Sequence, residues 1–317
     1  MTTAGHRASL REAYGRALVE LGERDPRTMV LDADRASATG SQSFARQFPE
    51  RAINLGVADA SMISIAAGLA LDGRTVFVGT NAVFAAGEAY NVVRQSVCLN
   101  AANVKVVGVP AGIGSGVDGA PLAMLEDLGL MRGLPGMTVV VPADAPSARS
   151  ATLAVAERPG PAYVRLSGEP RPDVTPGEIV IGRATQLRPG NDLTIVALGT
   201  LVAPALDLAE DLARIGISAR VLDFASVKPF DEPALLRAAR DTGAILVLEE
   251  HSVLTGVGAL VASATAENYP VPVRRVGIPD VFSDAGPPDV LFDRLGLSAA
   301  RLRDEAWELL KSRGKVS

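Results

Sequence analysis

Cysteine and histidine are scarce in this sequence. Its 317 residues include one cysteine, Cys98, and two histidines, His6 and His251. One cysteine cannot form a disulfide within the chain, and these few side chains cannot supply the ligands of a structural zinc site. We therefore expect no internal disulfide and no metal ligands in this chain. Cys98, which lies between Val97 and Leu99, is expected to be buried and inert.

An excess of basic residues and long apolar runs are also missing. The 31 Lys and Arg residues are outnumbered by 36 Asp and Glu residues, and the sequence pI is about 5.3. Nucleic acids and anionic lipid surfaces bind basic surfaces, so neither is an expected partner. No apolar run reaches the roughly 18 residues of a membrane helix, and the first residues lack the apolar core of a signal peptide. We expect a cytoplasmic protein that binds small molecules or other proteins.

What the sequence does contain is a regular α/β pattern. Ser9 is expected to begin a helix, because Glu12 follows three residues later. Short apolar runs typical of buried strands then alternate with helical segments. The expected helices are 10–21, 41–47, 59–71, 86–99 and 122–133, and the expected strands are 28–34, 52–55, 75–79, 104–108 and 137–141. This alternation predicts a mostly parallel sheet covered by helices on both faces.

A second α/β set follows a segment that fits neither pattern. Residues 167–178 are rich in proline, glycine and acidic residues, as linkers often are. After it, strands are expected at 193–200, 219–224, 244–251 and 273–280, with helices at 203–215 and 232–240 and near the C-terminus. We therefore predict two doubly wound, mostly parallel-sheet domains, residues 1–170 and 186–317, joined by a linker at 171–185.

Asp59 is the first candidate for chemistry. It follows a predicted strand and opens a predicted helix, and ligands of open parallel sheets bind at the carboxyl ends of strands. Its carboxylate could instead cap the first helical turn, a role that stabilises a helix by about 1 kcal/mol. The residues alone leave both interpretations open.

Several motifs in order resemble one family. These are NLGVADASM (54–62) with IAAGLA (65–70), AVFAAGEAYNVVRQSV (82–97), AGIGSGVDGAP (111–121), LEDLGLMRGLPGMTVVVPAD (125–144), EEHSVLTGVG (249–258) and GIPDVFSDAGPPDVLFDRLGL (277–297). Together they are similar to the pyrimidine-binding and C-terminal domains of the thiamin-diphosphate-dependent transketolases. The family transfers a two-carbon ketol unit from a ketose to an aldehyde.

The resemblance also implies a partner. A complete transketolase holds the cofactor's diphosphate through a divalent ion bound by a Gly-Asp-Gly motif and a later Asn, and this sequence contains no Gly-Asp-Gly. The chain is therefore expected to be the C-terminal subunit of a split transketolase. Its partner would carry the diphosphate-binding domain and hold Mg²⁺ or another divalent ion. Thiamin diphosphate would lie between the two chains in an α2β2 heterotetramer.

The family's site residues map onto this sequence position by position. Asp59 stands where the family has the glutamate that activates the cofactor, and it is one methylene shorter. The resemblance places Met62, Asn81 and Phe84 around the pyrimidine ring, with Asn81 in place of an aromatic residue. It assigns Asp118 and His251 to substrate, although His251 could equally be a buried histidine bonded to backbone at the end of a strand.

Three cationic or imidazole groups of the family are replaced here. Pro110 and Leu122 stand where the family has histidines, and Gly168 and Glu169 stand where an arginine grips a sugar phosphate. Arg165 is nearby but could be structural. A sugar phosphate needs positive partners. We therefore expect a substrate other than an ordinary pentose phosphate: a less polar acceptor, a free sugar or a carrier-bound acyl group.

Two other functions are compatible with these residues. The β chain of a 2-oxoacid dehydrogenase component shares the fold and the divided architecture, although residues 125–144 resemble transketolase more closely. A non-catalytic structural or regulatory subunit would also explain the altered site positions. A neighbouring gene that encodes Gly-Asp-Gly and a downstream Asn would favour the split enzyme.

Overall fold

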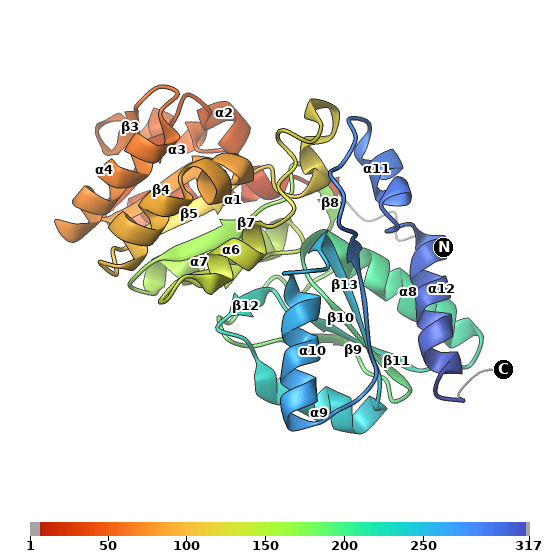
Figure 1. Ribbon diagram of the computed structural model, residues 1–317. Helices are drawn as coiled ribbons and strands as arrows, with labels where there is room; N and C mark the ends of the chain where they lie inside the picture. Colours follow the sequence, from red (N-terminus) through yellow and green to blue (C-terminus); the bar gives the residue numbers. More distant parts are fainter. Residues whose placement is uncertain (1–6, 315–317) are drawn as a thin grey trace.

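The computed structural model describes residues 7–314, which form two parallel α/β sheets with helices on both faces (Figure 1). A short antiparallel pair, β1 (Arg7–Ala8) with β8 (Arg171–Pro172), lies apart from them. The predicted fold class is confirmed, because each main sheet is mostly parallel. The boundaries at residues 170 and 185 stay a prediction.

The first sheet has the strand order β12-β6-β7-β5-β4-β2-β3. Its strands are β2 (Thr28–Asp32), β3 (Ala52–Asn54), β4 (Thr75–Thr80), β5 (Val104–Gly108), β6 (Thr138–Val140), β7 (Ala162–Arg165) and β12 (Ser226–Lys228). β12 runs antiparallel to β6, and the other pairings are parallel. Since β12 comes from the second half of the sequence, the two halves share this sheet.

Alternating side chains of the first sheet pack into two cores. Val76 and Val78 of β4 face one core and Phe77 faces the other, as the two-residue period of a strand requires. The Phe77 side is covered by α1 (Leu10–Arg24), α3 (Gln42–Gln47) and α7 (Ala145–Glu157). The Val78 side is covered by α4 (Asp59–Leu71), the π-helices η2 (Phe84–Glu88) and η3 (Val93–Cys98) with α5 (Tyr90–Val92) between them, and α6 (Asp127–Gly133).

The second sheet has the order β14-β13-β10-β11-β9. Its strands are β9 (Thr185–Arg188), β10 (Leu193–Ala197), β11 (Ala219–Asp223), β13 (Ile245–Ser252) and β14 (Val273–Ile278), of which β9 pairs antiparallel. One face packs against α8 (Val202–Arg214), α11 (Pro288–Arg294) and α12 (Ala299–Lys311), and the other against α9 (Glu232–Thr242) and α10 (Val257–Asn268). The remaining short helices are α2 (Ala36–Thr39), η1 (Pro49–Arg51), η4 (Ile113–Asp118) and η5 (Gly199–Leu201).

Local signals predicted most of these elements. Ser9 begins α1 as expected, with its hydroxyl accepting a hydrogen bond from the Glu12 N–H. Several expectations were wrong at their ends; the strand expected at 193–200, for example, ends at Ala197. The strand expected to reach residue 34 ends at Asp32, because Asp34 has a φ of 62°. The helix expected from residue 122 begins at Asp127, because the preceding segment is held by contacts with the second half of the chain.

Candidate active site

Asp59 lies at the carboxyl edge of the first sheet. It is the first residue of α4, whose N-cap is Ala58, and no side chain caps this helix. The helix-capping interpretation of Asp59 is therefore wrong. Asp59 as a residue is 4% exposed, and its Oδ1 accepts a hydrogen bond from the hydroxyl of Thr80, the last residue of β4. A buried carboxylate is thus fixed where α4 begins and β4 ends, near the positive end of the helix dipole.

Other predicted residues surround the end of β4. Asn81 is buried directly after Thr80, and the ring of Phe84 is half-buried one turn later. The carbonyl of Pro110, which follows β5, accepts a hydrogen bond from the Ala82 N–H at 3.2 Å. We call Asp59, Thr80, Asn81 and Phe84 the strand-end site. Met62 is fully buried in the core beneath it and has no exposed surface for a ligand in this chain.

The glycine-rich loop 111–122 crosses from the first sheet to the second. The Ile113 N–H donates to Glu250 Oε1 at 2.8 Å, and the Gly286 N–H donates to the Gly116 carbonyl at 3.2 Å. Gly112 has a φ of 67°, and a Cβ there would meet Glu250 Oε1 at 2.2 Å, so this close approach requires glycine. The loop leaves Asp118 exposed and Leu122 partly exposed.

A buried ion pair lies where the two sheets meet. Arg165 Nε donates to both oxygens of Asp127, at 2.9 and 3.2 Å, and the Tyr163 hydroxyl donates to Asp127 Oδ2 at 2.8 Å. Arg165 Nη2 also donates to the Glu250 carbonyl at 3.0 Å. Arg165 therefore hydrogen-bonds to both halves of the chain. These contacts fit the interpretation of Arg165 as a structural residue.

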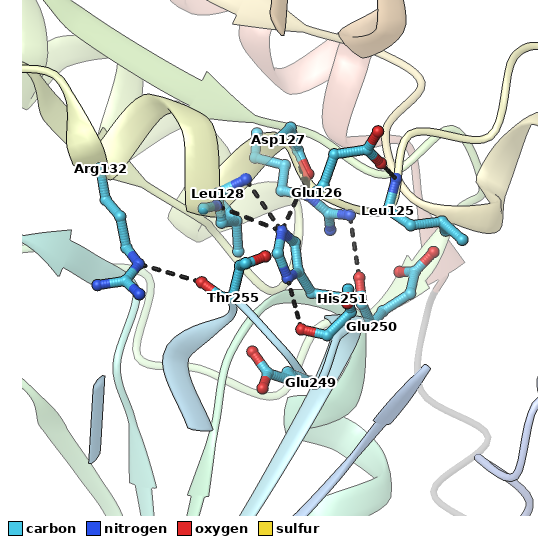
Figure 2. Close-up of polar contacts among 12 residues, drawn as sticks. Leu125, Glu126, Asp127, Leu128, Arg132, Glu249, Glu250, His251 and Thr255 are labelled. Carbon is cyan, nitrogen blue, oxygen red and sulfur yellow. Dashed lines mark hydrogen bonds and ion pairs between the residues drawn. The ribbon is translucent and has the colours of Figure 1, made fainter. Parts of the chain in front are cut away.

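His251 completes this cluster, and Figure 2 shows its ring pointing at the start of α6. Nε2 accepts from the Leu128 N–H at 3.1 Å, with the Gly129 N–H at 3.5 Å, and Nδ1 donates to the Ser252 carbonyl at 3.1 Å. Burial is the main reason that the pKa of His251 is lowered to about 4; Asp127 opposes this shift, and the Arg165 guanidinium contributes to it. The ring is therefore neutral and accepts from N–H groups at the start of α6. We call Asp127, Tyr163, Arg165, Glu250 and His251 the junction network.

Two glutamates of β13 lie beside His251 (Figure 2). The Glu250 carboxylate accepts from the Thr200 hydroxyl at 2.5 Å as well as from Ile113. The Glu249 carboxylate accepts from the N–H groups of Val257 and Gly258, at 2.6 and 3.0 Å, at the start of α10. Burial nevertheless raises the pKa of Glu249 to about 7. Each carboxylate is committed to neighbouring backbone or hydroxyl groups.

The structure thus separates the predicted residues into three places. Asp59, Asn81, Phe84 and Pro110 gather at the ends of β4 and β5, Asp118 and Leu122 lie on the loop, and His251 is inside the junction network. Both ring nitrogens of His251 are hydrogen-bonded to backbone groups, as expected of a buried histidine with a structural role. Neither nitrogen is free to contact a substrate.

Sequence reasoning missed Thr80, the partner of Asp59, and Arg35, whose guanidinium carbon lies 4.8 Å from the centre of the Phe84 ring. Both are polar residues at or just after the carboxyl end of a buried strand, and that position was the available signal. Two further side chains lie outside the strand-end site. Glu88, the other carboxylate near Phe84, is exposed, and Cys98 is partly buried, with the pKa of its thiol raised by burial to about 11.

Metal-ligand clusters and membrane-spanning helices are both absent from residues 7–314. In that range no group of three or more His, Cys, Asp or Glu side chains is arranged to hold a metal ion. No helix in the same range is both long and apolar enough to span a bilayer. His6 lies outside the described residues.

Known families and proteins match nearly the whole sequence. Residues 6–170 match the transketolase pyrimidine-binding domain, and residues 182–302 match the transketolase C-terminal domain. A 6-deoxy-6-sulfo-D-fructose transketolase subunit of Clostridium sp. strain MSTE9 is 42% identical over 95% of this chain and 94% of its own length. A subunit of the apulose-4-phosphate transketolase of Phocaeicola vulgatus is 35% identical over 97% of this chain and 99% of its own length.

The solved structures that match this chain are also transketolases. A split-gene transketolase described as an inactive β4 tetramer superposes with a TM-score of 0.90 at 44% identity, covering 96% of this chain and 98% of that one. The transketolase of Leishmania mexicana shares the fold, with a TM-score of 0.83 at 23% identity, and this chain covers 47% of it. The chain therefore belongs to the transketolase family and corresponds to its pyrimidine-binding and C-terminal domains.

Proposed function

We propose that this chain is the pyrimidine-binding subunit of a two-chain, thiamin-diphosphate-dependent transketolase. The observation that carries the proposal is the buried Asp59 carboxylate, bonded to Thr80 and placed beside Phe84 at the carboxyl edge of the first sheet. Two of the relatives described above are transketolase subunits of about the same length, which supports it.

The described residues fit the pyrimidine end of thiamin diphosphate. Phe84 offers a half-exposed aromatic ring for stacking, and Asp59 offers a buried hydrogen-bond acceptor. The sequence contains no Gly-Asp-Gly for the diphosphate end. We assign that end and its divalent ion to the partner chain.

When bound, thiamin diphosphate would supply an acidic thiazolium carbon, whose deprotonated form is the nucleophile required for two-carbon transfer from a ketose to an aldehyde. The role of Asp59 is to accept a hydrogen bond from the pyrimidine ring nitrogen, which polarises the ring's amino group toward removal of that proton. Thr80 holds the carboxylate in place. Aspartate is shorter than the family's glutamate, and the start of α4, fixed by the Thr80 bond, sets how far its carboxylate reaches. Asn81 is assigned to the surroundings of the pyrimidine ring, and Pro110, Asp118 and Leu122 to the walls of the substrate channel.

The open face of α4 is the proposed contact with the partner. This helix is apolar on all sides apart from Asp59 and two serines, yet Ser61, Ser64, Ile65 and Gly68 are exposed. These positions follow the i, i+3, i+4, i+7 spacing of one helix face. This exposed face carries two serines but no charged side chain, and depletion of charge is typical of a buried interface. Asp59 lies at the end of the same helix. We propose an α2β2 heterotetramer built on this contact, and self-association without activity when the partner is absent, as in the inactive β4 relative.

The relatives described above carry transketolase names, which favours transketolase over the β chain of a 2-oxoacid dehydrogenase component. From the replaced site residues we also propose that the ketol donor or acceptor is not an ordinary pentose phosphate.

Calorimetric titration of thiamin diphosphate and Mg²⁺ tests the proposal. We expect tight binding to a mixture of the chain with its partner, weak or no binding to either alone, and loss of binding to the mixture with Asp59→Ala. An Asp59→Ala mixture that binds as tightly as the wild type would remove Asp59 from the cofactor site. Absence of binding to any wild-type mixture would identify a structural or regulatory subunit.

A further inference from the structure

Arg35 is placed at the strand-end site by a rigid turn. The turn follows β2, and the Arg35 N–H donates to Asp32 Oδ1 at 2.5 Å. The preceding residue, Asp34, has a φ of 62°, and its N–H donates to Asn54 Oδ1 at 3.0 Å. These bonds join the turn to the ends of β2 and β3, so the backbone of Arg35 is fixed at the same sheet edge as Asp59.

The Arg35 side chain lies over the Phe84 ring, with its guanidinium carbon 4.8 Å from the ring centre. Stacking on an aromatic ring orients a guanidinium and leaves its N–H groups at the rim available for hydrogen bonding. The Nε atom is buried, and among the residues of 7–314 it has no hydrogen-bond partner. The ion pairs found in this range do not include Arg35.

A buried donor without an acceptor calls for an explanation, because buried polar groups are nearly always hydrogen-bonded. Folding alone does not supply an acceptor for this one. The neighbouring charged groups at this edge are carboxylates, Asp32, Asp34 and Asp59, and the buried cation Arg165 is committed to Asp127. Arg35 is therefore a cation next to the strand-end site that holds a free donor.

We propose that Arg35 binds an anionic oxygen of the sugar substrate, a phosphate or a sulfonate, and sets the preference of the enzyme for charged over neutral sugars. The planar guanidinium matches the geometry of such oxyanions. The inference rests on the proposed function. It departs from the substrate expected from the motifs, because Arg35 lies outside every motif that carried the resemblance and would replace the missing cation from a different loop. With this cation in place, the loss of the family's arginine no longer excludes a pentose phosphate, so one is included among the donors tested.

The test uses the complex of both chains and measures kcat/KM for an anionic and a neutral ketose. Xylulose 5-phosphate and 6-deoxy-6-sulfofructose serve as anionic donors and xylulose as the neutral donor. Arg35→Gln is expected to lower kcat/KM for the anionic donors about 10- to 100-fold, the usual effect of losing a hydrogen bond to a charged group. The value for xylulose should change less than about 3-fold, Arg35→Lys should restore part of the preference, and Arg46→Gln on the exposed face of α3 should match the wild type.

Two binding measurements separate this inference from the proposed function. Thiamin diphosphate affinity by calorimetry should be the same for wild type and Arg35→Gln. Xylitol 5-phosphate, which has no carbonyl to react, should bind the wild-type complex more tightly than xylitol, and Arg35→Gln should remove the difference. Equal losses for charged and neutral sugars, or a loss of cofactor affinity alone, would overturn the role of Arg35. Arg35-dependent binding of xylitol 5-phosphate without any ketol transfer would overturn the proposed function and leave the anion site standing.

Discussion

The strand-end site and the junction network both contain buried charged groups, and they differ in how these groups are satisfied. In the junction network, Asp127, Arg165 and His251 find their hydrogen-bond partners within the chain. At the strand-end site, Asp59 has one hydroxyl partner, and nearby Arg35 keeps a buried donor without an acceptor in the described residues. The hydrogen-bonded groups of the junction network connect the two halves of the chain, whereas the incompletely bonded groups of the strand-end site carry the proposed ligand contacts. Variants of the first group should change stability, and variants of the second should change activity.

The largest expected effect belongs to Asp59. Asp59→Asn keeps the shape and the Thr80 bond but replaces the charged acceptor. It should lower the rate of ketol transfer by the complex about 10²- to 10⁴-fold, the range of general acid–base contributions. Its urea midpoint should stay near that of the wild type. Glu88→Gln is the matched control, since Glu88 is exposed, and should alter the rate less than about 2-fold. Equal effects of the two substitutions would contradict the assignment of Asp59.

Substitution of Arg165 should change the stability of the chain, in contrast to substitution of Asp59, which should change the rate of ketol transfer. Arg165→Met leaves Asp127 buried without its cation and should lower the free energy of unfolding by about 3–5 kcal/mol. Arg214→Met removes ion pairs of a side chain that is 57% exposed and should cost at most about 1 kcal/mol. Urea denaturation of the isolated chain measures both. A stable Arg165→Met protein that has lost only activity would move Arg165 into the active site.

Substitution of His251 should have an effect on stability that depends on pH. His251→Leu should destabilise the chain by about 1–3 kcal/mol at pH 7.5, because the buried Leu128 N–H loses its acceptor. The folded pKa of His251 is about 4, and the unfolded value is near 6.5. Between these values the unfolded chain binds the proton and the folded chain does not, so the wild type loses stability as pH falls through this window.

The difference in stability between wild type and His251→Leu should therefore be full above pH 6.5 and shrink toward pH 4. Urea midpoints at pH 7.5, 6 and 5 measure it. Titration of Glu249, which acts in the opposite direction, is common to both proteins and cancels in the comparison. A difference that stays constant across this range would contradict a neutral, buried His251.

Thr80 carries the smallest expected effect. Thr80→Val preserves the shape of a fully buried side chain and removes the donor to Asp59. The rate of ketol transfer should fall about 10-fold, which corresponds to one hydrogen bond of ordinary strength. Thr152→Val is the control, because that buried hydroxyl donates at 2.8 Å to the Ala148 carbonyl within α7. A control that lowers the rate as much as Thr80→Val would show a general packing defect.

The sequence predicted helices and strands correctly where their boundaries depend on neighbouring residues. The expected helix at 59–71 and the expected strand at 104–108 coincide with α4 and β5. The failures depend on distant contacts. The segment before α6 is shaped by Glu250 and Gly286, more than 100 residues away in sequence. The contribution of β12 to the first sheet likewise comes from the second half of the chain.

The same limit applies to the site. The motif at residues 54–62 located Asp59, but the sequence could not reveal Thr80 as its partner, because that bond spans 21 residues and forms only when α4 packs on β4. The motif at 249–258 located His251, but its surroundings come from both halves of the fold. Arg35 was missed since its importance depends on the position of Phe84, not on the residues around it in the sequence.

The measurement that tests the split active site most directly is a titration of the partner chain into a fixed amount of this chain, followed by the initial rate of two-carbon transfer from a ketose to an aldehyde. A split active site predicts no transfer by either chain alone and a rate that rises to saturation at one partner per chain. Transfer by this chain alone, or no transfer at any ratio with a panel of charged and neutral ketoses, would contradict it.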